Sequence, residues 1–153
     1  MDPYFRPILL SSLIVIVLNT ILIIPISGAP IFSYFAGGVI AVLFFKNEMK
    51  LKDEYYVVKV FDVSVLGISV GVLVGAILTL IMTFKLRDPE VKQAIMDTIN
   101  EAMRMRSEAG FEVLDNLGPL FYIVTAIITM VMCALVSYFG ALASLPFINP
   151  KQK

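Results

Sequence analysis

Two polar residues, Asn19 and Asp62, lie within or directly beside long apolar runs and are the candidates for a polar function. Asn19 interrupts the first run, and Asp62 immediately precedes the third, with Lys59 one helical turn before it. An ionisable group in a membrane segment would suit proton coupling, because such residues usually mark proton or ion pathways. The more ordinary interpretation, which we favour, is an interhelical hydrogen bond at Asn19 and a solvated Asp62–Lys59 pair.

The other chemistry-bearing residue types argue against an enzyme. The chain has no histidine and a single cysteine, Cys133, inside an apolar run. Histidine is the commonest metal ligand and general base, and a Ser-His-Asp triad or a Cys–His pair requires it. Asp97 and Glu101 are interleaved with Arg104, which is typical of a solvated ion-paired face rather than a cation site. We therefore expect no catalytic residues, no metal ligands and no cofactor.

A row of small residues in the third apolar run predicts close helix packing. Gly67, Gly71 and Gly75 recur every fourth residue, and Ser64 extends the row by about one turn. A helix places these residues on one face, and a face without side chains lets another backbone approach closely. The alternative is that glycine is simply common in membrane helices.

The last apolar run offers a matching face. Cys133, Ser137 and Ala141 repeat at four-residue spacing, with Gly140 alongside. We expect this face to meet the glycine row, either within one chain or between two copies.

The elements that carry these residues are predicted membrane helices. Of the 153 residues, 59% are hydrophobic and only 16% are charged, against about 25% charged in ordinary soluble domains. Zero net charge gives no reason to expect a nucleic acid partner. We predict one all-α domain, an integral membrane four-helix bundle, with Pro146 ending the last helix. The predicted spans are 8–24, 30–45, 63–84 and 120–145.

Residues 85–116 form a polar insert that predicts an additional amphipathic helix. Asp88, Pro89 and Glu90 are typical of a helix start, with an N-cap, a proline at the first position and an acid in the first turn. Apolar residues then fall near one face, opposite charged ones, so the helix would lie at the membrane surface. The residues of this apolar stripe are Val91, Ile95, Ile99 and Met103.

Charge distribution predicts the orientation. Seven basic residues lie on the side of the termini, against five in the insert, where acids dilute them. The positive-inside rule then places the termini in the cytoplasm and the insert outside, in a multi-pass protein of the cell membrane. The seven are Arg6, Lys46, Lys50, Lys52, Lys59, Lys151 and Lys153.

The order of these parts resembles small, uncharacterised bacterial four-helix membrane proteins with an acidic amphipathic insert between helices three and four. Two stretches carry the resemblance: KNEMKLKDEYYVVKVFDVSVLGISVGVLVG, and DPEVKQAIMDTINEAMRMR leading to GPLFYIVTAIITMV. The resemblance covers most of the chain and is one of architecture. It implies the fold in a bacterial inner membrane, and it implies no substrate and no site residues.

Two functions from different classes follow. The first is a non-enzymatic membrane protein that works through helix–helix contacts, as an accessory subunit or a homo-oligomer. Its partners would be the lipid bilayer and other membrane subunits or a second copy. The alternative is a small transporter or channel for a neutral or lipidic solute. A water-filled path would distinguish the alternative, lined by Asn19, Thr20, Ser64 and Thr79.

Overall fold

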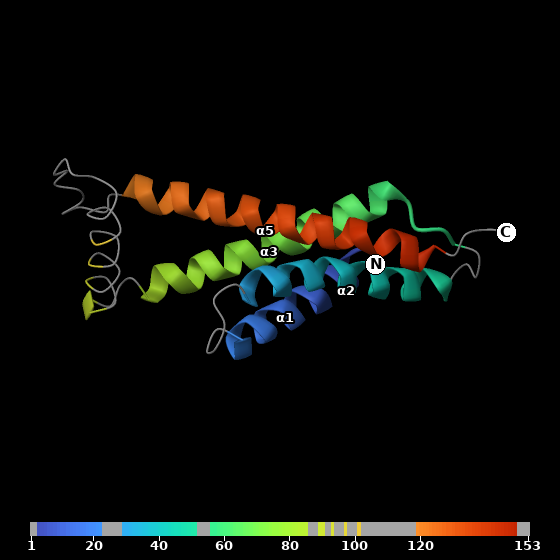
Figure 1. Cartoon of the computed structure of the whole chain (residues 1–153), viewed down its shortest axis with the longest axis horizontal. Helices are drawn as coiled ribbons and strands as arrows, with labels where there is room; N and C mark the ends of the chain where they lie inside the picture. Colours follow the sequence, from blue (N-terminus) through green and yellow to red (C-terminus); the bar gives the residue numbers. More distant parts are fainter. Residues whose placement is uncertain are drawn as a thin grey trace.

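All regular secondary structure in the described part of the chain is helical, as predicted from the sequence. The computed structural model describes residues 3–22, 29–51, 56–85, 89, 90, 93, 97, 101 and 119–149. Within these residues, four long helices pack side by side (Figure 1). They are α1 (Phe5–Leu22), α2 (Ala29–Lys50), α3 (Val60–Lys85) and α5 (Pro119–Ile148).

All four helices begin before the apolar runs that predicted them, and α2, α3 and α5 also end beyond those runs. Pro7 lies in the first turn of α1, where its missing N–H costs little because first-turn amides have no partner within the helix. At the other end of the chain, Pro146 was expected to end the helix, and this prediction is wrong. α5 continues to Ile148 although Pro146 has no N–H to donate. The Asn149 amide still donates to the Leu145 carbonyl at 3.0 Å.

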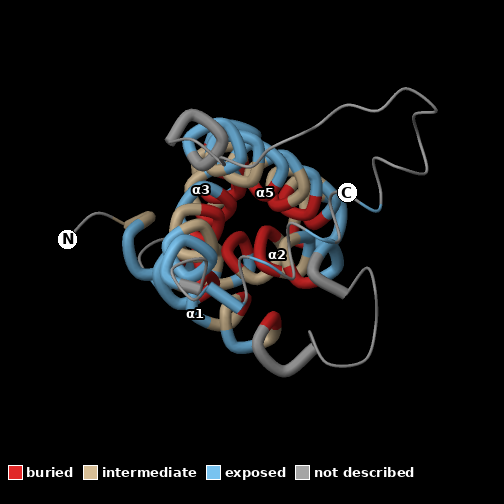
Figure 2. Tube along the Cα trace, turned by 90° about the vertical axis from the view of Figure 1, so that its left-hand side faces the viewer, coloured by how far each residue is buried: buried red, intermediate tan, exposed pale blue. Residues whose placement is uncertain are grey.

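The helices alternate in direction, so α2 and α5 run parallel to each other (Figure 1). Viewed end-on, α1 packs on α2 and α3, and α5 packs on the same two helices from the opposite side (Figure 2). Buried residues face the middle of this arrangement, and they include Val15, Phe45, Leu66 and Val70. At one end, α3 and α5 extend beyond α1 and α2.

Three of the helices are long and apolar enough to cross a membrane. These candidate spans are Ile31–Lys50, Val60–Phe84 and Ile123–Ile148, whereas the apolar stretch of α1, Phe5–Asn19, is shorter. At 1.5 Å per residue, the 25 residues of the second candidate exceed a hydrocarbon core of roughly 30 Å.

Most of the predicted amphipathic insert lies outside the described residues. Those that are described, Pro89, Glu90, Gln93, Asp97 and Glu101, are all helical and all exposed. Gln93, Asp97 and Glu101 are spaced four apart, so they share one helical face. That face is polar, as the sequence pattern requires, while the apolar stripe opposite it is not described.

Glycine brings α5 against α3 at backbone distance. A Cβ atom added to Gly67 or Gly75 would lie 2.7 or 2.8 Å from an α5 backbone atom, and one on Gly71 would lie closer still. Van der Waals radii forbid such contacts, so a side chain here would push the two helices apart. We call this contact the α3–α5 seam. Its α5 residues are Tyr138 at Gly67, Ala134 at Gly71 and Met130 at Gly75.

A second seam joins α2 to α5. A Cβ on Gly38 would collide with the Ser137 carbonyl oxygen, and a Cβ on Gly140 would collide with the Phe35 carbonyl oxygen. In both cases a glycine Cα–H points at a carbonyl of the other helix, the geometry of a weak Cα–H···O contact. The sequence grouped Gly140 with the face expected to meet the third helix, and it faces α2 instead. α5 therefore lies between two glycine seams.

Candidate functional site

The side chain of Asp62 is the most unusual polar group in the described structure, because it is a buried carboxylate. Its residue is only 4% exposed. The Tyr4 hydroxyl donates to Oδ1 at 2.7 Å, and the Tyr56 hydroxyl donates to Oδ2 at 2.9 Å. The backbone N–H of Lys59 donates to Oδ2 at 2.8 Å. Three donors, one from the start of the chain and two from the segment before α3, therefore meet on one carboxylate.

This geometry corrects the expectation of a solvated Asp62–Lys59 pair. The carboxylate is buried, and the Lys59 nitrogen that contacts it belongs to the main chain. Asp62 lies in the first turn of α3 and reaches back three residues to an amide that precedes the helix, as in a capping box. The positive end of the helix dipole further favours a negative charge at this position.

Phe45 of α2 orders the two tyrosines around the carboxylate. Its ring stacks on Tyr4 with centroids 5.0 Å apart and planes within 6°, and it meets Tyr56 edge-on at 6.0 Å. Burial raises the pKa of Tyr56 to about 12, and its hydrogen bond to Asp62 adds to the shift. The phenol therefore remains a hydrogen-bond donor throughout the physiological pH range.

The C-terminal end of α5 is tied to the same end of the bundle. The Asn149 side chain donates to the Val58 carbonyl at 2.9 Å and accepts from the Val58 amide at 3.3 Å, as a neighbouring strand would. Lys46 donates to the Ile148 carbonyl. This hydrogen bond satisfies a carbonyl at the helix C-terminus, where a positive charge is favourable. We call this group the end clasp, defined as Tyr4, Phe45, Lys46, Tyr56, Val58, Asp62 and Asn149.

Asn19, the other candidate polar residue, makes an interhelical hydrogen bond. Its Oδ1 accepts from the Ser33 hydroxyl of α2 at 3.0 Å, and its Nδ2 donates to the Val15 carbonyl at 3.1 Å. Asn19 is 3% exposed, so this pairing satisfies a polar side chain inside the bundle. It lies in α1 far from Asp62, and the structure does not bring the two candidates together.

The residues predicted to pack helices lie at the α3–α5 seam or close to it. The Cys133 carbonyl faces Gly71, and Ser137 and Ala141 face Gly67. Ser64 instead donates its hydroxyl to the Val60 carbonyl of its own helix at 2.9 Å.

Sequence reasoning missed Tyr4, Phe45 and Asn149. The only local signal was the position of each at the edge of an apolar run. Their partners lie far along the chain, and nothing in the spacing identifies them.

The end clasp holds chain segments together. Among the described residues, its side chains do not form a set of ligands for a metal ion. Both carboxylate oxygens of Asp62 already accept hydrogen bonds. Within the described ranges, no group of three histidine, cysteine or acidic residues could hold a metal ion. The arrangement can therefore fix the first turn of α1 and the segment before α3.

Comparison with known proteins yields no relative of this chain: no family, no curated protein and no solved structure matches it.

Proposed function

We propose that the chain is a multi-pass protein of the cell membrane that acts through helix–helix contacts and not by catalysis. It would serve as an accessory subunit of a membrane complex or as a homo-oligomer. The length and apolar composition of α2, α3 and α5 support a membrane location. Within a bilayer, its partners are lipid, other membrane subunits or a second copy.

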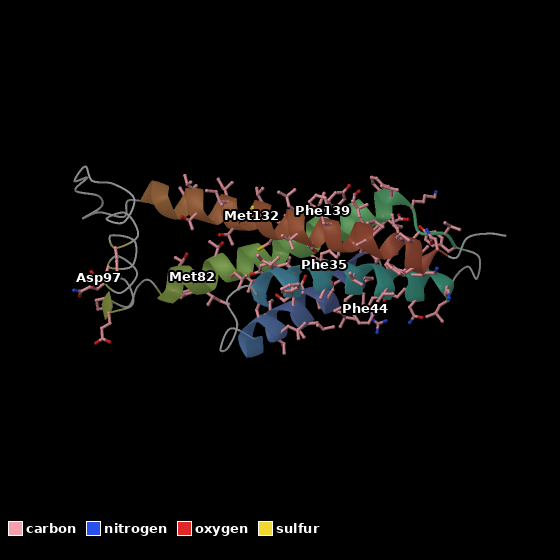
Figure 3. All side chains as sticks on the ribbon, in the orientation of Figure 1. Phe35, Phe44, Met82, Asp97, Met132 and Phe139 are labelled. Carbon is pink, nitrogen blue, oxygen red and sulfur yellow. The ribbon has the colours of Figure 1, made fainter. Side chains whose placement is uncertain are left out.

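One observation carries the proposal: the α3–α5 pair projects beyond the other helices with apolar side chains on its outer surface. Met82 on α3 and Met132 on α5 are 50% and 56% exposed (Figure 3). Leu80 and Ile128 are exposed to a similar extent. Methionine is common at adaptable binding surfaces because its side chain is flexible and polarisable. This projecting surface suits a partner helix that packs alongside the pair.

The hydroxyl groups give less support to a solute path. Ser64 and Thr79 donate to carbonyls of their own helix, Val60 and Gly75, at 2.9 and 2.8 Å. Asn19 is bonded to Ser33. The side chain of Thr20 lies outside the described residues. The described residues expected to line such a path are thus satisfied within the bundle, which favours a dry bundle, while the buried hydroxyls of Ser12 and Ser137 have no hydrogen-bond partner in the described part of the chain.

We further propose that the end clasp faces the cytoplasm and that the 85–116 insert forms an amphipathic helix on the other side. Arg6, Lys46, Lys50 and Lys59 all lie at the helix ends that carry the clasp, and basic residues favour the cytoplasmic side. Cysteines introduced at Lys50 and Glu101 would test this with a membrane-impermeant label. Labelling of position 101 only from the cytoplasmic side would reverse the orientation.

A photo-crosslinking residue tests the projecting surface directly. Ile128 of α5 and Leu13 of α1 are matched positions, 57% and 56% exposed, and only the first lies on the α3–α5 pair. In native membranes, we expect a discrete protein adduct from position 128 and only diffuse lipid adducts from position 13. An adduct of twice the chain mass would identify a homo-oligomer. Equal yields of protein adducts at both positions, or none at position 128, would contradict the proposal.

A further inference from the structure

α1 is attached to the bundle differently from the other helices. At its start, Tyr4 donates to Asp62 of α3, and towards its other end Asn19 accepts from Ser33 of α2. The rest of the bundle is held by the two glycine seams, which join the backbones of α2, α3 and α5 directly. α1 can therefore lose a polar attachment without any change in the seams.

Asp62 is the single acceptor on which the first of these attachments depends. Tyr4 lies 58 residues away along the sequence, and Tyr56 lies in the segment before α3. If the carboxylate is removed, both hydroxyls and the Lys59 amide lose these hydrogen bonds at once. The loss of a hydrogen bond to a charged group is costly even in a partly buried position, so these groups would then move towards water or headgroups.

Movement of Tyr4 would uncover an aromatic surface. Its ring stacks on Phe45, which is 1% exposed, and Phe45 in turn contacts Tyr56. The exposed ion pair between Arg6 and Glu48, 3.6 Å apart, is a weak constraint by comparison, because Arg6 is largely in solvent. Of these two polar contacts, the partly buried hydrogen bond to Asp62 is thus the stronger constraint on the first turn of α1.

We propose that Asp62 is a conformational latch that holds the first turn of α1 closed over Phe45. When the latch opens, this turn leaves the bundle and exposes the aromatic surface, while α2, α3 and α5 stay assembled through the seams. The latch acts within the chain and does not depend on what the projecting surface binds.

Paired spin labels test the latch in the purified full chain. One pair, at Phe5 and Lys50, joins the start of α1 to the end of α2, and both positions are exposed. A reference pair at Ile68 and Leu135 joins α3 to α5, also at exposed positions. The natural Cys133 is buried and remains in place. In Asp62→Leu, which keeps the shape of the side chain but removes both acceptor oxygens, we expect the first distance distribution to lengthen and broaden and the second to stay unchanged.

Two single-hydroxyl variants separate a latch from a general loss of stability. Tyr4→Phe removes the hydroxyl that donates to Asp62 and keeps the ring that stacks on Phe45, so it should reproduce the change in the Phe5–Lys50 pair. Tyr56→Phe keeps the Tyr4 hydrogen bond, so that pair should resemble the wild type. The latch is refuted if the first pair is unchanged in both Asp62→Leu and Tyr4→Phe. It is equally refuted if the reference pair shifts together with the first. Tyr4→Phe keeps the test decisive if Asp62→Leu does not fold.

Discussion

The α3–α5 seam and the end clasp hold the same bundle together by different means. At the seam, three glycines remove every side chain, and the two backbones touch along several turns. At the clasp, large side chains reach across from separate segments and meet on one carboxylate. The seam is therefore sensitive to any added atom, whereas the clasp is sensitive to the loss of a few particular atoms.

The energies of the two regions differ in the same way. A contact between two carbon atoms contributes only about 0.1–0.2 kcal/mol, so the seam depends on many contacts made at once. A hydrogen bond contributes about 1 kcal/mol by itself, and its geometry is directional. The contacts of the seam are therefore kept or lost together, whereas the hydrogen bonds of the clasp can break one at a time. The following experiments test this difference between the seam and the clasp.

Gly71→Ile should have the largest effect. Its side chain would enter the backbone of Ala134 at the middle of the α3–α5 seam, where neither helix can yield locally. We expect a loss of about 3 kcal/mol or more in unfolding free energy, at the upper end of overpacking effects. Thermal unfolding in detergent measures it, with Leu73→Ile on a more exposed face of α3 as the control. Equal melting temperatures for the two variants would show that the glycine row is not a packing contact.

Adjacent glycines in α2 allow the same substitution to be made towards two different neighbours. Gly38→Ala would press on the Ser137 carbonyl of α5, whereas Gly37→Ala would press on a Val15 methyl group of α1. Alanine favours a helix over glycine by roughly 0.8–1.0 kcal/mol, which offsets part of either cost. We expect Gly38→Ala to lose about 1–3 kcal/mol and Gly37→Ala to stay within about 1 kcal/mol of wild type. Chemical denaturation would compare them, and the reverse order would mean that α1 is the less yielding neighbour.

A double-mutant cycle between Asn19 and Ser33 should give a smaller coupling. Their hydrogen bond joins α1 to α2 inside the bundle at 3.0 Å. Interhelical hydrogen bonds in membrane proteins average about 0.6 kcal/mol and reach at most about 1.7. We expect a coupling in that range from Asn19→Ala, Ser33→Ala and the double variant. A coupling energy near zero would show that packing, and not this hydrogen bond, fixes the C-terminal half of α1.

Alkaline pH should produce the smallest effect, confined to the clasp, because Tyr56 is only partly buried and solvent screens its interaction with Asp62. The folded pKa of Tyr56 is about 12, above its ordinary value of 10.0, so the folded state holds the phenolic proton more tightly. The stability that this gives is fully present below pH 10 and is lost as the pH rises to 12. Melting temperature should decline less steeply over that interval in Tyr56→Phe than in wild type. Identical profiles would indicate that the hydroxyl of Tyr56 titrates normally.

The helical fold class could be predicted from the sequence because a long apolar run indicates a helix without any knowledge of distant residues. The spacing of Gly67, Gly71 and Gly75 also identified which face of α3 lacks side chains. It did not show that α5 would meet two helices, since Gly140 on α5 has no neighbour in the sequence that points to α2. Assigning that contact requires the relative rotation of the helices, which depends on packing of the whole bundle.

The end clasp could not be predicted for a related reason. Tyr4 and Asp62 are 58 residues apart, and Asn149 and Val58 are 91 apart. A carboxylate at the edge of an apolar run is usually solvated, and only the three-dimensional positions of Tyr4, Phe45 and Tyr56 reverse that expectation for Asp62.

The position of α5 between two seams also constrains the order of biogenesis. Chains emerge from the ribosome N-terminus first, and Tyr4, Phe45, Tyr56 and Asp62 are all made before most of α3. The tyrosine–aspartate contacts can thus form early, whereas both seams must wait for the 30 residues of α5. Until then, the glycine face of α3 has no helix of its own chain to cover it. A nascent chain stalled before Pro119 would present this bare face to insertases and quality-control proteases, which could distinguish it from a finished molecule.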